Sequence, residues 1–343
     1  MRDPMGINLS DIVPKQSKTL EDFKDKTIAI DAHNVLYQFL ANIRTADGSM
    51  LMDDLGRPTS HLNGLFLRTA KMISVGIKPI YVFDGKPHEL KTRTIKQRRE
   101  VKEKAKEDYQ LALEAGDMER ARMKAAQTSY LSSEMIADAQ ELLGYLGIPW
   151  LTAPSEGEAQ ACHLANSGDA WAVVSQDYDS LLFGTPRLIR NLTISGRRKV
   201  PGQNRYVNVE PEIIELQFVL SAIGLTREQL IDVGILVGTD FNPGVKGFGP
   251  KTAVKAIKEY NNLERVMKEK ELEISNVEVV RKIFKEPDVT NDYSITWSPV
   301  DTEKVLEFLC EARAFNYDRV SSSLENFEKF KSAITQKSLD QWF

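Results

Sequence analysis

The run Thr27-Ile-Ala-Ile-Asp31 is a short apolar stretch that ends on an aspartate. Two further stretches have the same form, Ile80-Tyr-Val-Phe-Asp84 and Trp171-Ala-Val-Val-Ser-Gln-Asp177, and the second of these continues to Asp179. Apolar runs of this length, separated by segments with helical spacing, are typical of parallel strands buried on both faces. We therefore predict an α/β fold in which helices flank a central, mostly parallel, twisted sheet.

The aspartates that end these runs predict a metal site, because ligands collect beyond the carboxyl ends of parallel strands. Carboxylates crowded there repel one another unless cations compensate their charge. Hard cations such as Mg²⁺ take oxygen ligands, so carboxylates without His or Cys suit them better than zinc. Two such ions about 4 Å apart can promote hydrolysis of a phosphodiester. Seven acids form the candidate set: Asp31, Asp84, Glu156, Glu158, Asp177, Asp179 and Asp240.

Each acid also has a structural interpretation. A single aspartate at a strand end is commonly a turn residue, and Ser155-x-x-Glu158 matches a capping box. Residues i and i+2 of a helix do not share a face, so Glu156 and Glu158 could converge only in a first turn. Asp177-Tyr-Asp179 resembles the start of a calcium loop, but the EF-hand glycine and terminal glutamate are missing. The recurrence of acids at strand ends favours the metal site.

Two basic segments stand out in a chain whose net charge is −4. From Lys86 to Lys106 there are nine Lys or Arg and three Glu, and from Phe241 to Lys258 there are four Lys and no acid. The second segment contains a Gly-rich loop, Gly244–Lys251, that resembles a helix-hairpin-helix grip on duplex backbone, since glycines let backbone N–H groups approach phosphate. The alternatives are a solvated helix face and an ordinary inter-helix turn. Beside an acidic metal centre, both segments favour a polyanionic substrate.

The remaining composition is that of an ordinary globular chain of 343 residues, 42% hydrophobic and 27% charged, with a mean hydropathy of −0.33. No apolar stretch reaches the roughly 18 residues of a membrane span, and no signal peptide is recognisable. Two cysteines, Cys162 and Cys310, fit a reducing interior. We leave Met1–Pro4, which precede a second methionine, outside the fold.

Six motifs together resemble the flap endonuclease family of structure-specific 5′ nucleases, over essentially the whole chain from Met5. They are Ile30-Asp-Ala32, Pro58-Thr-Ser-His-Leu-Asn-Gly64, Tyr81-Val-Phe-Asp-Gly-Lys-Pro87, Ala153-Pro-Ser-Glu-Gly-Glu-Ala159, Ser175-Gln-Asp-Tyr-Asp-Ser180 and Val237-Gly-Thr-Asp240. The resemblance implies a PIN-like 5′ nuclease fold. Residues 1–327 would form the nuclease core, with a helical arch at about 86–130 and a helix-hairpin-helix region at about 219–260. Residues 328–343 would form a C-terminal tail.

The resemblance implies Mg²⁺-dependent cleavage at the junction of a 5′ flap with duplex DNA, with 5′–3′ exonuclease activity, in Okazaki fragment maturation and DNA repair. The seven acids would serve two Mg²⁺ ions, for which Mn²⁺ would substitute. Lys91 and Arg98 would contact the scissile phosphate, and Tyr37 would stack on a base near the cut. K⁺ would bind at Gly244–Lys251. The implied DNA contacts are Arg44, Arg68, Gly247, Gly249 and Lys251, with Thr59 and Arg319 at a one-nucleotide 3′ flap.

The C-terminal residues match the box with which family members bind the sliding clamp (PCNA). Its residues are Gln336, Leu339, Trp342 and Phe343. The alternative is a tail that packs on its own core. Eukaryotic members carry a basic tail beyond this box, so an end at Phe343 favours an archaeal, cytoplasmic protein, whereas a eukaryotic member would be nuclear. We also expect the protein to be a monomer. The family's N-terminus lies near the active site, at the glycine that matches Gly6, so the four extra residues would have to be accommodated or removed.

Two other functions remain open from the residues alone. One is a PIN-like ribonuclease without a duplex grip, against which the Lys-rich loop and the clamp box argue. The other is a catalytically silent DNA-binding protein associated with the clamp, against which the presence of all seven acids argues.

Overall fold

The computed structural model describes residues 6–45, 47–194, 196–199 and 206–340, and of residues 197–199, 206 and 331–340 it describes the backbone alone. In this part of the chain, seven strands form one sheet in the order β1-β9-β6-β5-β2-β3-β4. Their bounds are β1 (Gln16–Ser17), β9 (Glu212–Glu215), β6 (Arg187–Arg190), β5 (Ala172–Val174), β2 (Thr27–Asp31), β3 (Lys78–Phe83) and β4 (Trp150–Thr152).

The five strands from β6 to β4 are parallel, and β9 and β1 extend the sheet in antiparallel register. The predicted α/β fold is confirmed. Strand β2 is the middle one of the five parallel strands, and its Asp31 is the register partner of Val82 of β3. Asp84 follows β3 directly, and Asp177 lies three residues beyond β5. The sheet therefore carries three of the predicted acids to the same edge.

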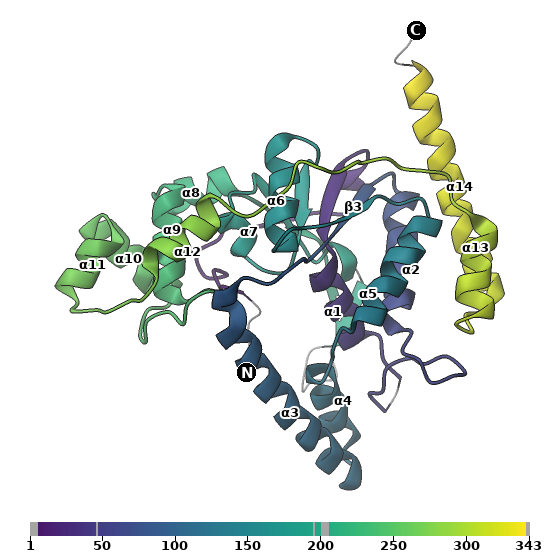
Figure 1. Cartoon of the computed structure of the whole chain (residues 1–343), viewed down its shortest axis with the longest axis horizontal. Coiled ribbons are helices and arrows are strands. Elements are labelled where there is room, and N and C mark those ends of the chain that lie inside the picture. The colour runs from purple at the N-terminus through teal and green to yellow at the C-terminus, as the bar shows by residue number, and fades with distance from the viewer. Residues whose placement is uncertain (1–5, 46, 195, 200–205, 341–343) are drawn as a thin grey trace.

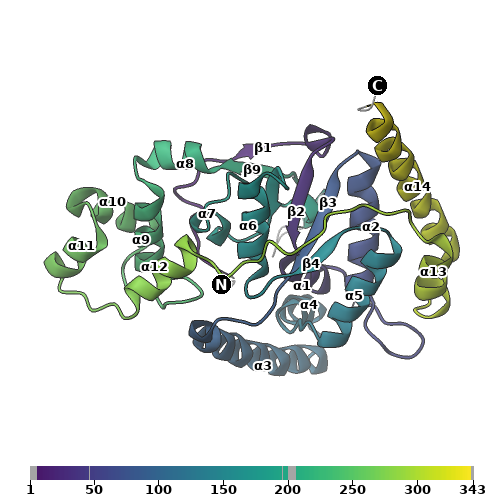
Figure 2. The ribbon, with the colours of Figure 1, turned by 45° about the horizontal axis from the view of Figure 1, so that its top comes forward.

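Both faces of the sheet are buried, as the continuous apolar runs predict. Ala29 of β2 packs in one hydrophobic cluster, and its neighbours Ile28 and Ile30 pack in the other. The first cluster is covered by α6 (Gly157–Ser167), α7 (Asp179–Leu182), α8 (Leu216–Ile223) and α9 (Arg227–Val237). The second is covered by α1 (Ala32–Asn42), α2 (Ser60–Ser74), α5 (Ser133–Tyr145), α13 (Thr302–Leu306) and α14 (Tyr317–Asp340), on the other side of the sheet in Figures 1 and 2.

An arm of two helices, α3 (Thr92–Glu114) and α4 (Met118–Gln127), projects from the body (Figure 1). The short helix η2 (Glu89–Lys91) leads into it, and Gly116, at φ +71°, turns the chain between the two helices. The buried residues of the arm helices are alanines, Ala105, Ala112, Ala121 and Ala125. Small side chains let the two helices approach, while the exposed surface of the arm mixes many charged side chains with some hydrophobic ones, such as Leu111 and Met123.

A second helical extension follows α9. It contains α10 (Pro250–Tyr260), α11 (Leu263–Glu269) and α12 (Val277–Lys285). The Gly-rich loop joins α9 (ending at Val237) to α10 (beginning at Pro250), and its assignment as a helix-hairpin-helix grip stays a prediction. Gly244, at φ +69°, is required there, because a Cβ would lie 2.3 Å from the carbonyl oxygen of Val237.

The remaining described elements are short: η1 (Glu21–Phe23), η3 (Leu192–Ile194), the antiparallel pair β7 (Gly196–Lys199) and β8 (Tyr206–Val209), and the π-helix η4 (Glu307–Glu311). Helix α14 runs across the predicted boundary between residues 327 and 328. Among the described helices, none is both long and apolar enough to cross a membrane.

Candidate active site

The seven predicted acids lie at or near the carboxyl edge of the parallel strands, and three of them accept hydrogen bonds from backbone amides alone. Asp31 is the N-cap of α1, where its Oδ1 accepts the N–H of Asn34 at 3.0 Å. The N–H of Gly157 donates to Asp84 Oδ1 at 2.7 Å, and that of Ile7 donates to Asp179 Oδ1 at 3.2 Å. Segments distant in the sequence therefore fix the orientation of these carboxylates.

Side chains hold two more acids. Asn34 Nδ2 donates to Asp177 Oδ2 at 2.9 Å, and Glu158 Oε1 accepts hydrogen bonds from the backbone N–H and the hydroxyl of Ser180. The capping-box interpretation of Ser155 and Glu158 is wrong, because α6 begins at Gly157 with Glu156 as its N-cap. Glu158 instead turns from the first turn of α6 toward α7.

Six of the carboxylates share one arrangement: one oxygen accepts a hydrogen bond from the protein, and the other accepts none among the described residues. They are Asp31, Asp84, Glu156, Glu158, Asp177 and Asp179. The unbonded Glu156 Oε1 is also buried. A carboxylate that is oriented through one oxygen and has its second oxygen free of hydrogen bonds is suited to bind a hard cation.

Glycines let the backbone approach two of the carboxylates closely. A Cβ on Gly6 would lie 2.8 Å from Asp179 Oδ2, and a Cβ on Gly157 would lie 2.8 Å from Asp84 Oδ1. These distances are shorter than real Cβ contacts, so a larger residue at either position would push a carboxylate out of place.

The acids interact strongly through their charge. Burial raises the pKa of Asp31 to about 7, and the charge of Asp84 adds to this. Burial and then the charge of Asp240 raise the pKa of Asp179 to about 7. Burial, followed by neighbouring carboxylates, also raises the pKa values of Glu158 and Asp177 well above the usual range. Because the charged forms of these carboxylates are disfavoured, a bound cation would stabilise them.

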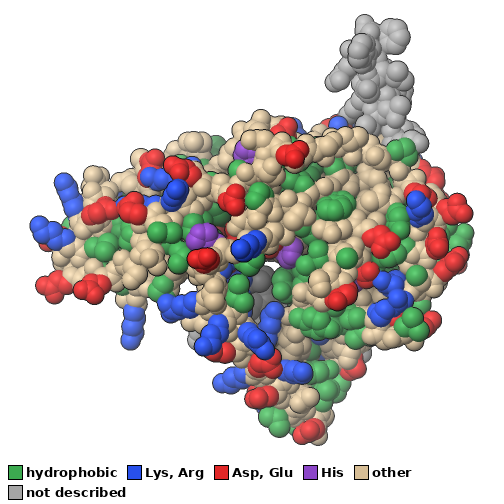
Figure 3. Space-filling view, viewed as in Figure 1, with side chains coloured by type: hydrophobic (Ala, Val, Ile, Leu, Met, Phe, Trp, Pro, Cys, Tyr) green, Lys and Arg blue, Asp and Glu red, His purple; other side chains and the backbone are tan. Residues whose placement is uncertain are grey.

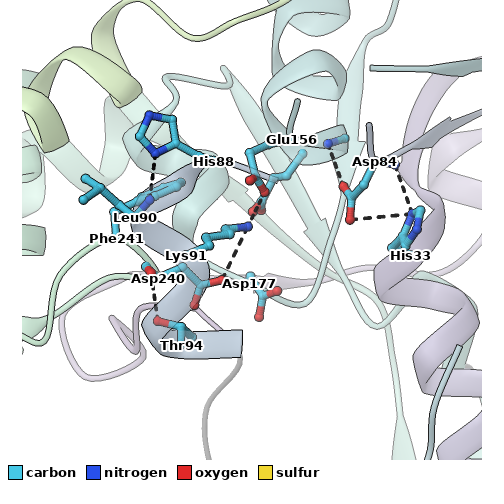
Figure 4. A network of polar contacts seen from close by, with 12 residues as sticks. His33, Asp84, His88, Leu90, Lys91, Thr94, Glu156, Asp177, Asp240 and Phe241 are labelled. Atoms are coloured by element: carbon cyan, nitrogen blue, oxygen red, sulfur yellow. Dashed lines mark hydrogen bonds and ion pairs between the residues drawn. The ribbon is translucent and has the colours of Figure 1, made fainter. Parts of the chain in front are cut away.

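Two basic side chains at the start of the arm, Lys91 and Arg98, supply positive charge at this site. The Lys91 ammonium contacts Glu156 and lies 3.6 Å from Asp240 Oδ2 (Figure 4). One terminal nitrogen of Arg98 donates to both oxygens of Asp240, at 2.6 and 2.8 Å. Thr94 Oγ1 donates to the backbone carbonyl of Asp240 at 2.8 Å. The first turns of α3 are thus attached to the acids themselves.

The carboxylates fit a divalent ion that keeps part of its water shell. Among the described residues, no three His, Cys, Asp or Glu side chains stand close enough to enclose an ion directly. Mg²⁺ retains several waters and binds through one or two carboxylates, so it does not need such a cage. The all-oxygen set, the raised pKa values and the orphaned Glu156 Oε1 all agree with Mg²⁺ or a similar ion.

The other predicted DNA contacts lie in several environments. Lys102 Nζ lies 4.9 Å from the centre of the Tyr37 ring and covers that ring. Arg44 donates to the carbonyls of Leu40 and Gly48 and to Ser129 Oγ, at 2.7–2.8 Å, and so ties α1 to the end of the arm. Arg68 is partly buried on α2, where burial lowers its pKa.

The structure brings Thr59 and Arg319 together from opposite ends of the sequence. Both line one pocket of about 220 Å³ between the start of α2 and the start of α14, with Arg313 and Phe315 among its other walls. In the Gly-rich loop, Gly247 has φ +92° and Gly249 is the N-cap of α10, so Lys251 is exposed in the first turn of that helix.

The predicted clamp box lies at the C-terminal end of the chain. Gln336 and Leu339 belong to the helical backbone of α14, whose last turns extend away from the body in Figure 1. Trp342 and Phe343 lie outside the described residues. The clamp contact therefore stays a prediction.

We call the carboxyl ends of the parallel strands, with the seven predicted acids beside them, the acidic edge. Sequence reasoning missed two residues there, His33 and Asn34. Asn34 contacts both Asp31 and Asp177, and His33 Nδ1 accepts the backbone N–H of Asp84 at 3.0 Å. One signal was available: Asp31 stands three residues before Asn34 at the start of a helix, which is the spacing of an N-cap bond. The bond from Asn34 to Asp177 spans 143 residues and has no local signature.

The fold and the acidic edge define a class, the nucleases of the XPG type. Residues 5–105 match the family model of the XPG N-terminal domain, and residues 147–240 match that of the XPG I-region. Among solved structures, flap endonuclease-1 from Methanococcus jannaschii is 42% identical, with a TM-score of 0.76 over 96% of this chain and 99% of that one. The catalytic core of Rad2 in complex with DNA substrate is 26% identical, with a TM-score of 0.68 over 91% and 96% of the two chains.

Curated relatives identify the family. Flap endonuclease 1 of Methanosarcina acetivorans is 47% identical over 99% of this chain and 100% of its own length, and that of Staphylothermus marinus is 50% identical over the same shares. The chain belongs to the flap endonuclease 1 family. It is a DNA nuclease that cuts at 5′ flaps, and nucleases of this family depend on divalent metal ions.

Proposed function

We propose that the seven carboxylates hold two Mg²⁺ ions, for which Mn²⁺ can substitute, and that hydrolysis at a flap junction takes place at this edge. The observation that carries the proposal is the shared arrangement of the six carboxylates, each with one oriented and one unbonded oxygen. When bound, a pair of divalent ions supplies Lewis-acid stabilisation of the phosphate oxygens and lowers the pKa of an attacking water.

Lys91 and Arg98 bind and orient the scissile phosphate in this proposal. Lys91 at the end of η2 and Arg98 on α3 both face the acids, so a phosphate that reaches the acids also meets these two side chains. Their charge would offset the negative charge that grows on the phosphoryl oxygens as water attacks. Tyr37 lies on α1 beside them, and a base of the substrate would replace Lys102 on its ring.

The DNA on either side of the cut is held away from the acids. Gly247, Gly249 and Lys251 would grip downstream duplex through backbone N–H groups and one ammonium, with K⁺ at the Gly244–Lys251 loop. The pocket that contains Thr59 and Arg319 would accept a 3′ flap of one nucleotide, and its volume of about 220 Å³ suits a single nucleotide better than a longer strand. Arg44 and Arg68 would support the duplex backbone. The Rad2 core, a similar structure, was solved with DNA substrate, which supports this assignment.

The biological setting is part of the same proposal. The chain would act as a monomer in the cytoplasm of an archaeon, on Okazaki fragments and on DNA under repair, with an additional 5′–3′ exonuclease activity. Gln336, Leu339, Trp342 and Phe343 would recruit it to the sliding clamp by filling a hydrophobic pocket. Deletion of Trp342 and Phe343 should leave the cleavage of free flaps unchanged and remove stimulation by the clamp.

The decisive experiment is cleavage of a labelled double-flap DNA with and without Mg²⁺, with the position of the cut mapped. We expect one cut at the flap junction that leaves a 5′-phosphate and disappears in EDTA. Faster cleavage of single-stranded RNA than of the flap would favour the ribonuclease. Binding of the flap without cleavage in Mg²⁺ or Mn²⁺ would favour the silent DNA-binding protein.

A further inference from the structure

The first turn of α1 contains two polar side chains that face the acidic edge, His33 and Asn34. Asn34 is 6% exposed, and both ends of its amide are used. Its Nδ2 donates to Asp177 Oδ2 at 2.9 Å, and its Oδ1 accepts the backbone N–H of Gln176 at 3.2 Å. A carboxylate cannot donate and a backbone N–H cannot accept, so only this orientation of the amide satisfies both partners.

The same turn reaches the other two strand ends. The backbone N–H of Asn34 donates to Asp31 Oδ1 at 3.0 Å, and His33 Nδ1 accepts the backbone N–H of Asp84 at 3.0 Å. The His33 ring packs edge-on against Phe83, with ring centroids 6.0 Å apart, which fixes its orientation. Two consecutive residues therefore connect the carboxyl ends of β2, β3 and β5, the three central strands that carry the aspartates.

We propose that His33 and Asn34 form a brace that sets the spacing of Asp31, Asp84 and Asp177 before any cation binds. The inference rests on the proposed role of these acids as metal ligands. The brace touches the carboxylates or their backbone and not the reacting atoms, so His33 and Asn34 are positioning residues.

The need for a brace follows from the repulsion among the acids. Carboxylates at the ends of adjacent strands separate by turning toward solvent unless something holds them. A lysine could hold them, but its charge would compete permanently with a metal ion for the same oxygens. The neutral Asn34 amide instead engages one oxygen of Asp177 and, through the backbone, one oxygen of Asp31. The second oxygen of each carboxylate accepts no hydrogen bond in the described part of the chain and stays available to a cation.

The test is the affinity of the DNA-free protein for Mn²⁺ alone, measured from the loss of the free-ion signal in electron paramagnetic resonance. Asn34→Leu keeps a side chain of similar size and removes both amide bonds. We expect its affinity for Mn²⁺ to fall by about 10-fold or more, the usual effect of losing a residue that orients metal ligands. His33→Phe keeps the ring and removes the acceptor for the Asp84 N–H, and we expect a smaller loss of roughly threefold.

A matched control lies on the same helix. Asn42 is exposed at the C-terminal end of α1, away from the acids, and Asn42→Leu should bind Mn²⁺ as the wild type does. A second measurement separates positioning from damage to the fold. For Asn34→Leu, the Mn²⁺ concentration at half-maximal cleavage should rise with the dissociation constant, while KM for flap DNA stays within about twofold, because the DNA contacts lie elsewhere.

Wild-type Mn²⁺ affinity in a folded Asn34→Leu protein would overturn the brace. If Asn34→Leu does not fold, Asn34→Ser takes its place, since its short side chain leaves room for a water beside the Gln176 amide. The failure of the proposed function has a different result. If Asp179→Ala binds Mn²⁺ as tightly as the wild type, the acids are not the metal site. If Asp179→Ala loses Mn²⁺ and Asn34→Leu does not, the brace alone is wrong.

Discussion

The acidic edge of the sheet and the basic arm differ in how their charged side chains are held. Each of the six carboxylates is oriented by a hydrogen bond, and most stand on strand ends or helix starts that pack into the core. The arm buries little besides alanines, and Figure 3 shows Lys and Arg side chains on its surface, interspersed with acidic and hydrophobic ones. The carboxylates are thus held by the fold, whereas the predicted phosphate contacts lie on an extension that packs mainly through small side chains.

The two regions are nevertheless connected by charge. Lys91, Thr94 and Arg98, from η2 and the start of α3, contact Glu156 and Asp240, so the arm neutralises part of the acidic edge in the DNA-free chain. A metal ion or a phosphate that arrives competes with these contacts. The comparison predicts that changes at the edge remove the chemistry, whereas changes on the extensions weaken substrate use by degrees.

The largest effect is expected from Asp179→Ala. The loss of a carboxylate at the centre of the edge should abolish cleavage, a reduction of at least about 10³-fold, since it removes electrostatic stabilisation that nothing else replaces. Binding of flap DNA should stay within a few-fold of the wild type, because the DNA contacts lie elsewhere. Single-turnover cleavage and a binding titration on one double-flap substrate measure both. Wild-type turnover by this variant would contradict the assignment of the acids as metal ligands. The proposed difference between the acidic edge and the arm would then have no support.

Arg98→Ala tests the arm where it touches the edge. We expect single-turnover cleavage to fall by about 10²-fold, because the guanidinium would no longer offset charge on the phosphate. Arg99→Ala is the matched control, since the neighbouring side chain is exposed and makes no described contact with the acids. Equal losses in both variants would show that the arm contributes general positive charge and no specific contact.

The sequence predicted the framework of the edge because local features encode it. Three apolar runs that end on aspartate specify parallel strands, and parallel strands bring their ends together. The sequence did not reveal that Gly157 and Ile7 donate to Asp84 and Asp179, since backbone donors carry no residue signature. It also left open a capping box at Ser155, which the structure rules out, because a capping box and an acid at the start of a helix look alike in one sequence.

Local sequence patterns say less about the predicted DNA contacts, for a related reason. Arg44 matches a family position, yet its guanidinium donates to three protein oxygens, and no local pattern distinguishes a structural arginine from a phosphate contact. The pocket of Thr59 and Arg319 forms only when α2 and α14 pack, so the sequence implies it only through the family resemblance. Local periodicity predicts elements, whereas contacts over hundreds of residues depend on the completed fold.

Lys251→Ala tests the second extension, which is farther from the chemistry. Flap affinity should fall several-fold, and the slope of log affinity against log salt should decrease by about one, as for the loss of one phosphate contact. The cleavage rate of bound DNA should not change. Lys329→Ala on α14, where the lysine pairs with Glu325 at 3.3 Å, serves as the control. An unchanged salt slope would remove Lys251 from the DNA interface.

The smallest expected effect is on stability. It measures how much the charge of the acidic edge destabilises the metal-free protein. The pKa of Asp179 is raised from 3.8 to about 7, mainly by burial, so its charged form is disfavoured in the folded chain. The free-energy cost of the charged carboxylate in the folded state is therefore absent below about pH 4, grows as the pH rises, and is complete above about pH 7.

Asp179→Asn keeps an oxygen that can accept the Ile7 N–H and removes the charge. In EDTA at pH 8 its Tm should exceed that of the wild type by roughly 2–5 °C, and the difference should shrink at pH 5. Addition of Mg²⁺ should reverse the order, because the ion stabilises the folded state that binds it better. A Tm difference that does not depend on pH would show that the gain comes from packing and not from charge.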